Sequence, residues 1–510
     1  MGTTSILYIV IAAYLVLMVV LGWLGRRSNS NISEMTVGRR NAGAWMSAFS
    51  YGTAYFSAVM FIGYAGATGW SYGLWGVLPG IGNAVFGSWL AWRVLARRTR
   101  TVTRRLGIRS MPQFFEQRFG SKAIKQFCVA VIFLFLIPYS ASVYKGLTSV
   151  CTVLLGVDER ICMIVIALAA AAVIILGGYM AALRADFLQG IVMLGGVLAL
   201  IFCVVRSRQV GGWQAGIQAI AQKTKDLNLG AAQHIALWAT VLMTSFGTWG
   251  LPQMVHKYYG IKDDAQIRRG TVISTVFACV VAVGGYFIGS LSRLFFAELP
   301  AEGQDYLVPN LLKMAGMPDV LLGVVLVLLI SASVSTLASI TLTASTTLTM
   351  DLVQDRIWKK LSAKGAAVFN RVVVLAFIVL SYWIANSDTP ILDMMSYSWG
   401  IISGSFMGPY LLSLYDKKLN RAGAWAGMIG GFVIALPPLV CRLFFPDAAL
   451  PFFGKVAGMG AHFACLAMVF SPLLCLLVSR LCKRSAVGNE TFYQQTVLSM
   501  PDPTGADQSV

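Results

Sequence analysis

Long apolar stretches separated by short polar or basic segments follow one another along the whole chain. Thirteen of these stretches have about 20 residues or more, the length that an α-helix needs to cross the hydrocarbon core of a bilayer. They cover residues 5–24, 43–70, 74–96, 124–156, 161–180, 185–206, 236–256, 271–293, 320–350, 366–386, 390–415, 423–445 and 458–482. The pattern predicts an all-α polytopic membrane protein with 13 transmembrane helices.

The composition is also that of a membrane protein. Hydrophobic residues make up 57% of the chain and charged residues 12%, whereas soluble domains carry about 25% charged residues. The surplus apolar surface must therefore face lipid. The nine cysteines form no closely spaced pairs and the three histidines are scattered, so neither a disulfide framework nor a zinc site is expected. Because no apolar stretch holds a carboxylate pair or a nucleophile elbow, an enzyme is not expected either.

The net charge of +19 reflects the sidedness of the loops rather than a nucleic-acid partner. Of the 40 lysines and arginines, 30 fall on one side of the predicted topology, nine on the other, and one, Lys145, within a stretch. Basic loops stay in the cytoplasm, so the N-terminus is expected outside and the C-terminus inside. We expect a multi-pass protein of a bacterial cytoplasmic (inner) membrane that contacts the lipid bilayer and binds no nucleic acid.

The number of crossings suggests an internal inverted repeat. Two groups of five stretches begin on opposite sides, as inverted repeats require, because an odd number of crossings reverses the second copy. The predicted divisions are a first helix with a basic loop (1–42), two repeats (43–206 and 236–415), two accessory helices (416–482) and a disordered cytoplasmic tail (483–510).

Both repeats open with nearly the same string. Ser50–Thr53 reads Ser-Tyr-Gly-Thr, and Ser245–Thr248 reads Ser-Phe-Gly-Thr, each near the middle of its stretch. Glycines follow the first string, and Gly250 and Pro252 follow the second. Such residues weaken a helix, and interrupted helices at matching positions of two halves indicate a transport site. The alternative is that these glycines only permit close helix packing.

The ninth stretch carries an unusual number of hydroxyl groups. Between Ser331 and Thr349, 11 of 19 residues are serine or threonine. One helical face combines Ala332, Ser335, Thr336 and Ser339 at positions i, i+3, i+4 and i+7. Two hydroxyl oxygens and a carbonyl on this face suit a hard monovalent cation. Alternatively, the hydroxyls bond back to the i−4 carbonyls and bend the helix.

Ionisable residues within the stretches are few, and they are functional candidates because burying a charge in a bilayer is costly. Asp186 begins the sixth stretch; it is either part of a site or a helix-start carboxylate paired with Arg184. Lys145 lies 19 or more residues into the fourth stretch. Its ammonium group pairs with a substrate carboxylate, pairs with an internal acid, or extends toward the outer surface.

Several segments together resemble the sodium:solute symporter family, which includes the proline, pantothenate, sialic acid and sodium/glucose transporters. The resemblance runs over about residues 5–482. It rests on Val37–Arg40 with Ala44–Trp45, Gly177–Gln189, Gly250–Gln253, Ser335–Leu337 with Asp351–Leu352, and Trp399–Gly400 with Gly408–Pro409. It implies a LeuT-type five-plus-five inverted-repeat bundle with one extra N-terminal and two extra C-terminal transmembrane helices, and it implies coupling to Na⁺.

The resemblance also implies a sodium site at the break of the second stretch. Its ligands fall on the carbonyls of Thr53, Phe56 and Ala332 and on the hydroxyls of Ser335 and Thr336.

Some family members have a second sodium site, which here falls on Asp186, Ser335, Ala338 and Ser339. Alanine at 338 supplies no side-chain oxygen, so this second site lacks one ligand.

Substrate-lining positions of the family fall on Tyr55, Ser57, Lys145, Thr248 and Trp249. Tyr55 stands where proline carriers have an acidic residue, and Thr248 stands where they have an aromatic residue, which disfavours proline itself. If Lys145 faces the cavity, an organic carboxylate fits best, since it supplies a buried charge with its partner.

The expected function is sodium-coupled symport of a small organic solute, an organic acid or amino acid, by alternating access, with the monomer as functional unit. The alternatives are a sodium-coupled sugar or polyol symporter and a non-transporting membrane sensor with the same fold. Coupling to protons through Asp186 also stays open.

Overall fold

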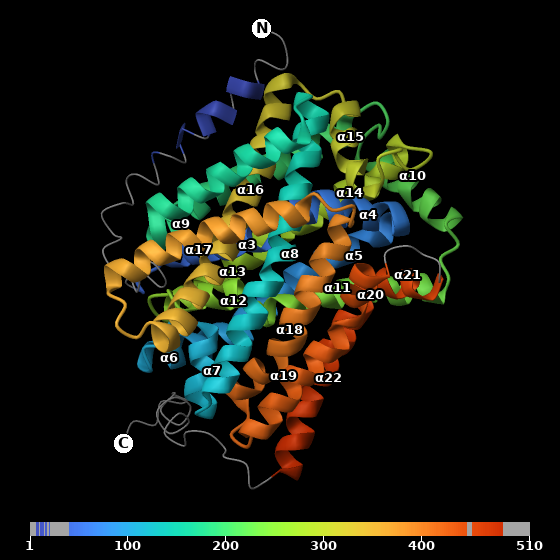
Figure 1. The fold of residues 1–510 in the computed structure, drawn as a ribbon. Coiled ribbons are helices and arrows are strands. Elements are labelled where there is room, and N and C mark those ends of the chain that lie inside the picture. Colours follow the sequence, from blue (N-terminus) through green and yellow to red (C-terminus); the bar gives the residue numbers. More distant parts are fainter. Residues whose placement is uncertain are drawn as a thin grey trace, which may run out of the picture.

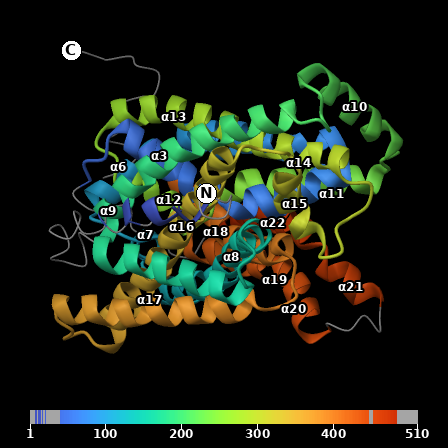
Figure 2. The same ribbon diagram turned by 90° about the horizontal axis from the view of Figure 1, so that it is seen from above.

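The computed structural model describes residues 40–445 and 451–482, with a few residues of the first predicted span (7–9, 11–14, 16–17 and 20). Side chains at 169–170 and 172–181 are not described. Most of the first predicted span and the whole predicted tail, 483–510, therefore lie outside the described residues. The described chain is a bundle of helices (Figures 1 and 2).

The helices follow one another along the chain in two halves, with η marking short 3₁₀ or π-helical pieces. The first half has α3 (Ala44–Tyr55), η2 (Val59–Tyr64), α4 (Ala65–Tyr72), η3 (Gly73–Val77), α5 (Leu78–Gly82), η4 (Asn83–Leu90), η5 (Trp92–Ala96), α6 (Arg97–Arg105), α7 (Met111–Phe119), α8 (Lys122–Leu155), α9 (Glu159–Arg206) and α10 (Trp213–Asp226). The second half has α11 (Ala231–Phe246), η6 (Gly247–Trp249), α12 (Pro252–Val255), η7 (His256–Tyr258), α13 (Asp264–Ala278), η8 (Cys279–Val283), α14 (Gly284–Phe295), η9 (Gln304–Tyr306), α15 (Leu307–Met314), α16 (Asp319–Thr346), η10 (Thr347–Ile357), α17 (Ala363–Ala385), α18 (Ile391–Tyr415), α19 (Arg421–Ala435), α20 (Pro437–Phe444), α21 (Pro451–Ala457) and α22 (Gly460–Leu481).

The described helices include membrane spans, as the apolar pattern predicted. Six are long and apolar enough to cross a bilayer, or seven if α19 and α20, which meet at a 40° bend, form one span. The six are Lys122–Leu155, Ala182–Arg206, Asp264–Phe295, Asp319–Ile357, Ala363–Ala385 and Gly460–Leu481. The protein is therefore a multi-pass membrane protein, and the total of thirteen spans stays a prediction.

One predicted boundary falls beside residues whose side chains are not described. The sequence predicted separate spans over 161–180 and 185–206, and the backbone is helical from Glu159 to Arg206. Within α9, Ala182–Arg206 is by itself long and apolar enough to cross a bilayer. The division of α9 into two spans stays a prediction.

Both predicted helix interruptions are present. In the first, α3 ends at Tyr55, Phe56 is extended (φ −105°, ψ 100°), and helical structure resumes near Val59. In the second, α11 gives way to the 3₁₀ turn η6, and Leu251 is extended before Pro252 starts α12. Proline suits this place because its missing N–H would have no partner in a first helical turn.

Small residues let the helices around the first interruption pack closely. A Cβ atom on Gly69 of α4 would overlap the backbone of Gly289 on α14, so these two helices meet backbone to backbone. The described chain also has one isolated parallel β-bridge, between Ala42 and Ile261. It joins the segment before α3 to the segment after η7, and so fixes the two interrupted helices relative to each other.

Candidate functional site

The end of α3 meets α16 at the first interruption. The single hydroxyl hydrogen of Thr336 lies between two acceptors, the carbonyl oxygens of Thr53, at 3.1 Å, and of Ala332, at 3.0 Å. Thr53, Ala332 and Thr336 are all fully buried, with no solvent exposure. Because α3 ends two residues after Thr53, the last backbone carbonyls of α3 do not all accept a hydrogen bond from within the helix. This is the place where the sodium ligands were predicted.

Ser335 connects this cluster to the only carboxylate that contacts it among the described residues. Its hydroxyl lies 3.0 Å from the hydroxyl of Thr53 and donates to Oδ1 of Asp186 at 2.6 Å. Four of the five predicted sodium-site residues are therefore linked by hydrogen bonds: Thr53 to Ser335 and Thr336, and Thr336 to the i−4 carbonyl of Ala332. The fifth, Phe56, is buried at the interruption itself and caps α3, its N–H bonding the carbonyl of Gly52.

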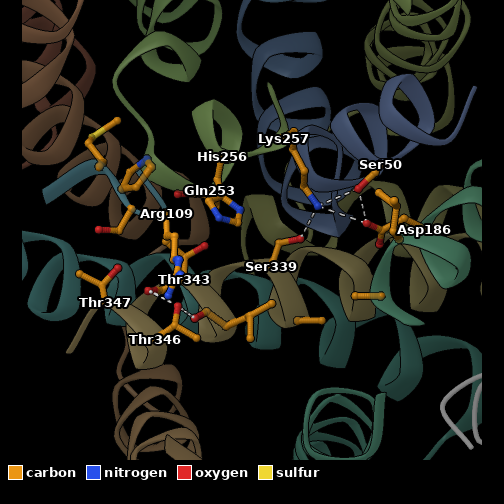
Figure 3. Close-up of a pocket in the computed structure, with 17 residues that line it drawn as sticks. Ser50, Arg109, Asp186, Gln253, His256, Lys257, Ser339, Thr343, Thr346 and Thr347 are labelled. Atoms are coloured by element: carbon orange, nitrogen blue, oxygen red, sulfur yellow. Dashed lines mark hydrogen bonds and ion pairs between the residues drawn. The ribbon is translucent and has the colours of Figure 1, made fainter. Parts of the chain in front are cut away.

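The sequence analysis missed one member of the site, Lys257. Its ammonium group donates to Ser50 Oγ at 2.8 Å, to Asp186 Oδ2 at 3.2 Å and to Ser339 Oγ at 3.1 Å. Ser50 also hydrogen-bonds Asp186 Oδ2. Figure 3 shows these side chains pointing toward one another from four segments of the chain.

The structure corrects two sequence-based interpretations. Lys257 was counted among the loop cations, whereas its side chain is only 8% exposed. Asp186 pairs with this lysine, whereas Arg184, the partner considered from sequence, is exposed. The sequence does contain a sign that Lys257 is buried: it follows the interruption at Gly250 and Pro252 by only a few residues. A cation so close to a broken helix is at membrane depth rather than in a loop.

A narrow pocket leads to this cluster. It extends from Ser50, Asp186 and Lys257 past Ser339 to Arg109 at the N-terminal side of α7 (Figure 3). Its volume of about 30 Å³ is far below the roughly 300–1,000 Å³ of small-molecule sites. Water and single ions fit in such a space, and an organic solute does not.

Three of the five predicted solute-lining residues, Tyr55, Thr248 and Trp249, form a second, separate cluster. The hydroxyl of Tyr55 donates to the carbonyl of Thr244 at 2.7 Å, and that of Thr248 donates to the carbonyl of Ser245 at 3.1 Å. The indole N–H of Trp249 donates to the carbonyl of Phe86 at 3.0 Å. The side chains of Tyr55, Thr248 and Trp249 are all buried.

This second cluster gathers at Gly87 of η4. Thr248 Oγ1 lies 3.5 Å from the Gly87 carbonyl, and a Cβ atom on Gly87 would overlap the hydroxyl of Tyr55. Tyr55 also stacks on Trp399, with ring centroids 6.2 Å apart. Ser57 lies at the other end of the interruption, where its hydroxyl accepts a hydrogen bond from the N–H of Val59 at 3.3 Å.

Lys145 is not part of either cluster. Its ammonium group donates to the backbone carbonyls of Ser387 and Thr389, both at 2.9 Å, in the connection between α17 and α18. It lines a cavity of about 350 Å³ with Asp305. Burial raises the pKa of the Asp305 carboxyl, and the ammonium of Lys145 acts in the opposite direction. Of the three roles considered, this geometry favours a side chain that extends toward the surface; a solute carboxylate as its partner stays a prediction.

Comparison with known proteins gives a consistent family assignment. The sodium:solute symporter family matches residues 36–431, which is most of the chain. A sodium/proline symporter of Staphylococcus aureus (strain JH9) is 26% identical over 442 residues, covering 84% of this chain and 85% of the relative. The sequence resemblance to this family is confirmed.

Solved structures agree on the fold. A Na⁺-coupled sialic acid symporter in a substrate-bound outward-open state has a TM-score of 0.71 at 18% identity, covering 92% of this chain and 97% of that one. A nucleobase-cation-symport-1 family transporter in a closed conformation has a TM-score of 0.58 at 13% identity, covering 92% and 99%. At such identities the likeness shows the architecture alone.

Proposed function

The chain belongs to the sodium:solute symporter family, and on this basis we propose that it imports a small organic solute together with Na⁺ by alternating access. The solute that fits best carries a carboxylate, as an organic acid or an amino acid does. The observation that carries the proposal is the meeting of buried oxygens from Thr53, Ala332, Ser335 and Thr336 at the interruption of α3.

These residues fit a sodium ion because they offer uncharged oxygens, backbone carbonyls and hydroxyls, at one buried point beside a carboxylate. Sodium would be held by the carbonyls of Thr53, Phe56 and Ala332 and the hydroxyls of Ser335 and Thr336. The bound ion supplies a positive charge that α16 and the end of α3 share. A ligand shifts a conformational equilibrium only by its difference in affinity between the two states. Because the ligands lie on two separate segments, their relative movement changes sodium affinity.

The solute would lie beside the ion, in contact with Tyr55, Ser57, Thr248 and Trp249. Tyr55 and Thr53 belong to the same interrupted helix, so sodium binding and solute binding act on one hinge. A carboxylate solute agrees with the 26% identical relatives, whose name gives proline as their solute. Tyr55, at the position where proline carriers have an acidic residue, still disfavours proline itself as the solute of this chain.

Lys145→Met tests whether the ammonium group of Lys145 pairs with a solute carboxylate. If its ammonium leaves the carbonyls of Ser387 and Thr389 to pair with a solute carboxylate, Lys145→Met abolishes uptake of that solute. If the solute is a sugar or polyol, Lys145→Met retains uptake. Uptake into proteoliposomes with an inward sodium gradient, screened over labelled carboxylates and polyols, measures this.

The proposal includes orientation and location. The N-terminus faces outward and the C-terminus faces the cytoplasm of a bacterial inner membrane, and one chain transports by itself. The segments that carry most basic residues, such as the connection around α6, are then cytoplasmic. The pocket beside Arg109 leads to the cytoplasmic side in this arrangement.

Thermal unfolding of the purified protein in detergent tests sodium binding without knowledge of the solute. Sodium chloride is titrated against choline and potassium chloride at constant ionic strength. We expect a stabilisation that follows RT ln(1 + [Na⁺]/Kd), about 2.7 kcal/mol at 100 times Kd. The Ser335→Ala, Thr336→Ala double variant loses it.

A matched control is the Ser333→Ala, Thr341→Ala double variant. These two hydroxyls are equally buried on the same helix but belong to neither cluster. We expect its sodium response to equal that of the parent. A flat response of the parent protein, or an unchanged response of the Ser335→Ala, Thr336→Ala variant, would contradict the proposed sodium site.

A further inference from the structure

The ammonium group of Lys257 lies where a second cation was expected from sequence. The expected ligands of that second sodium are Asp186, Ser335, Ala338 and Ser339. In the structure Lys257 contacts two of them, Asp186 and Ser339, and also Ser50, which the sequence analysis did not include. The lysine therefore makes the contacts that a cation at this place would make.

The hydrogen bonding of this group is complete. An ammonium has three N–H donors, and Lys257 has three oxygen partners at 2.8–3.2 Å. Asp186 is also engaged at both oxygens: Oδ2 accepts from Lys257 and Ser50, and Oδ1 accepts from Ser335. The cation position at Oδ2 is therefore taken by the ammonium group.

The charges lead to the same result. Asp186 and Lys257 are buried and together neutral. A sodium ion at the same carboxylate would leave one net positive charge and place two cations side by side. Buried charges without partners are strongly unfavourable. Ala338 also supplies no side-chain oxygen to hold the added ion. The residues present therefore do not fit a second sodium ion.

The position of Lys257 gives this pairing a structural role. Lys257 follows the second interruption, and Ser50 precedes the first. Asp186 comes from α9 and Ser339 from α16. One ammonium group thus holds both interrupted helices to two of the helices around them, as a shared metal ion would.

We propose that Lys257 is a tethered cation that replaces a second sodium ion at Asp186, so that this chain binds one sodium ion instead of two. The count of one rests on the proposed function, since the remaining ion is the one held by Ser335 and Thr336. The replacement of the second ion rests only on the contacts of Lys257.

The first test counts ions on the parent protein. Equilibrium binding of ²²Na⁺ to the purified full-length chain is expected to give about one ion per chain at saturation. Two ions per chain would overturn the tethered cation and leave the proposed function intact. No bound sodium would contradict the proposed function, and the lysine variants then decide the tethered cation on their own.

The second test removes the tethered cation. In Lys257→Ala the carboxylate of Asp186 faces the narrow pocket without its partner, and we expect it to take up a sodium ion. The number of bound ions rises by one, and the slope of unfolding temperature against the logarithm of sodium concentration doubles. Lys257→Gln, which retains hydrogen-bonding groups near Ser50 and Ser339, serves as a second variant.

Three controls separate this result from general destabilisation. Lys257→Arg keeps the charge and is expected to bind the parental number of ions. Asp186→Asn with Lys257→Ala removes both charges and is also expected to bind the parental number. Lys125→Ala removes another buried lysine, whose ammonium group lies 2.7 Å from Glu116. Because this pair is not part of the Asp186 site, the variant controls for the loss of a buried lysine as such. If Lys257→Ala and Lys257→Gln bind no more sodium than the parent, the proposal is wrong.

Discussion

The two helix interruptions begin with nearly the same four residues but lie in different surroundings. After Ser50–Thr53, the chain meets a buried carboxylate, an ammonium group and two hydroxyls. After Ser245–Thr248, it meets backbone carbonyls of η4 and the ring of Trp399. The string Ser50–Thr53 lies beside charged groups and a narrow pocket, and the string Ser245–Thr248 lies among neutral, closely packed groups.

This difference shows what a broken helix contributes and what its neighbours contribute. Both interruptions free backbone groups at membrane depth, which is possible only inside the protein. Thr53 uses this freedom to accept a hydrogen bond from Thr336 on another helix. The carbonyl of Gly247 accepts one from Ser403 on α18 at 2.5 Å. The local sequence opens the helix, and the partner helix decides whether the opening suits an ion or a solute.

The largest expected effect comes from breaking the ion pair at the first interruption. Asp186→Asn alone leaves the ammonium of Lys257 buried without its carboxylate. We expect a loss of about 3–5 kcal/mol in the free energy of unfolding, measured by chemical denaturation in choline chloride. Asp186→Asn combined with Lys257→Met removes both charges and is expected to recover most of that loss. If the double variant loses as much as the sum of the single variants, the two groups do not interact.

Exchanging hydroxyls for alanine distinguishes the chemistry of the two interruptions. We expect Thr336→Ala to weaken the sodium-dependent stabilisation, which reaches about 2.7 kcal/mol at 100 times Kd in the parent. Thr248→Ala removes a hydroxyl at the other interruption and is expected to leave that stabilisation unchanged. Unfolding temperatures in sodium and in choline measure both variants. A sodium effect of Thr248→Ala equal to that of Thr336→Ala would contradict the comparison.

The second interruption is expected to be sensitive to side chains that disturb its packing. The methyl group of Gly87→Ala would overlap the hydroxyl of Tyr55, which then loses its hydrogen bond to Thr244. Overpacking of this kind costs about 1–3 kcal/mol, and the loss is expected to be the same in sodium and in choline. In a Tyr55→Phe background the same substitution should cost less, because the overlapping hydroxyl is absent. An equal cost in both backgrounds would mean that the strain arises elsewhere.

The smallest effect concerns the hydroxyl of Thr248 in the absence of solute. Its contacts are neutral: a hydrogen bond to the carbonyl of Ser245 at 3.1 Å and a longer one to the carbonyl of Gly87 at 3.5 Å. Its removal is expected to lower the free energy of unfolding by about 0.5–1.5 kcal/mol. Thr248→Ser keeps the hydroxyl and serves as the control in the same denaturation measurement. A loss above this range would indicate that Thr248 has a larger role than the described contacts give it.

The sequence by itself determined the class of protein and the places where its helices break. Apolar length identified membrane helices, Gly250 and Pro252 marked the second interruption, and the spacing on 331–349 brought Ser335 and Thr336 to one face. These features are local, so a single chain segment carries each of them. The first interruption lies at Phe56, before the glycines that were expected to weaken this helix, and those glycines are helical.

Only the tertiary structure decided which charges meet. Lys257 is 71 positions from Asp186 and 207 from Ser50; its own segment indicates its depth in the membrane but not which groups it meets there. The same folding directs Lys145 to the carbonyls of Ser387 and Thr389, more than 240 residues away. Electrostatic contacts act over a few ångströms in space, and that distance between chain segments is set by helix packing rather than by the pattern within one helix.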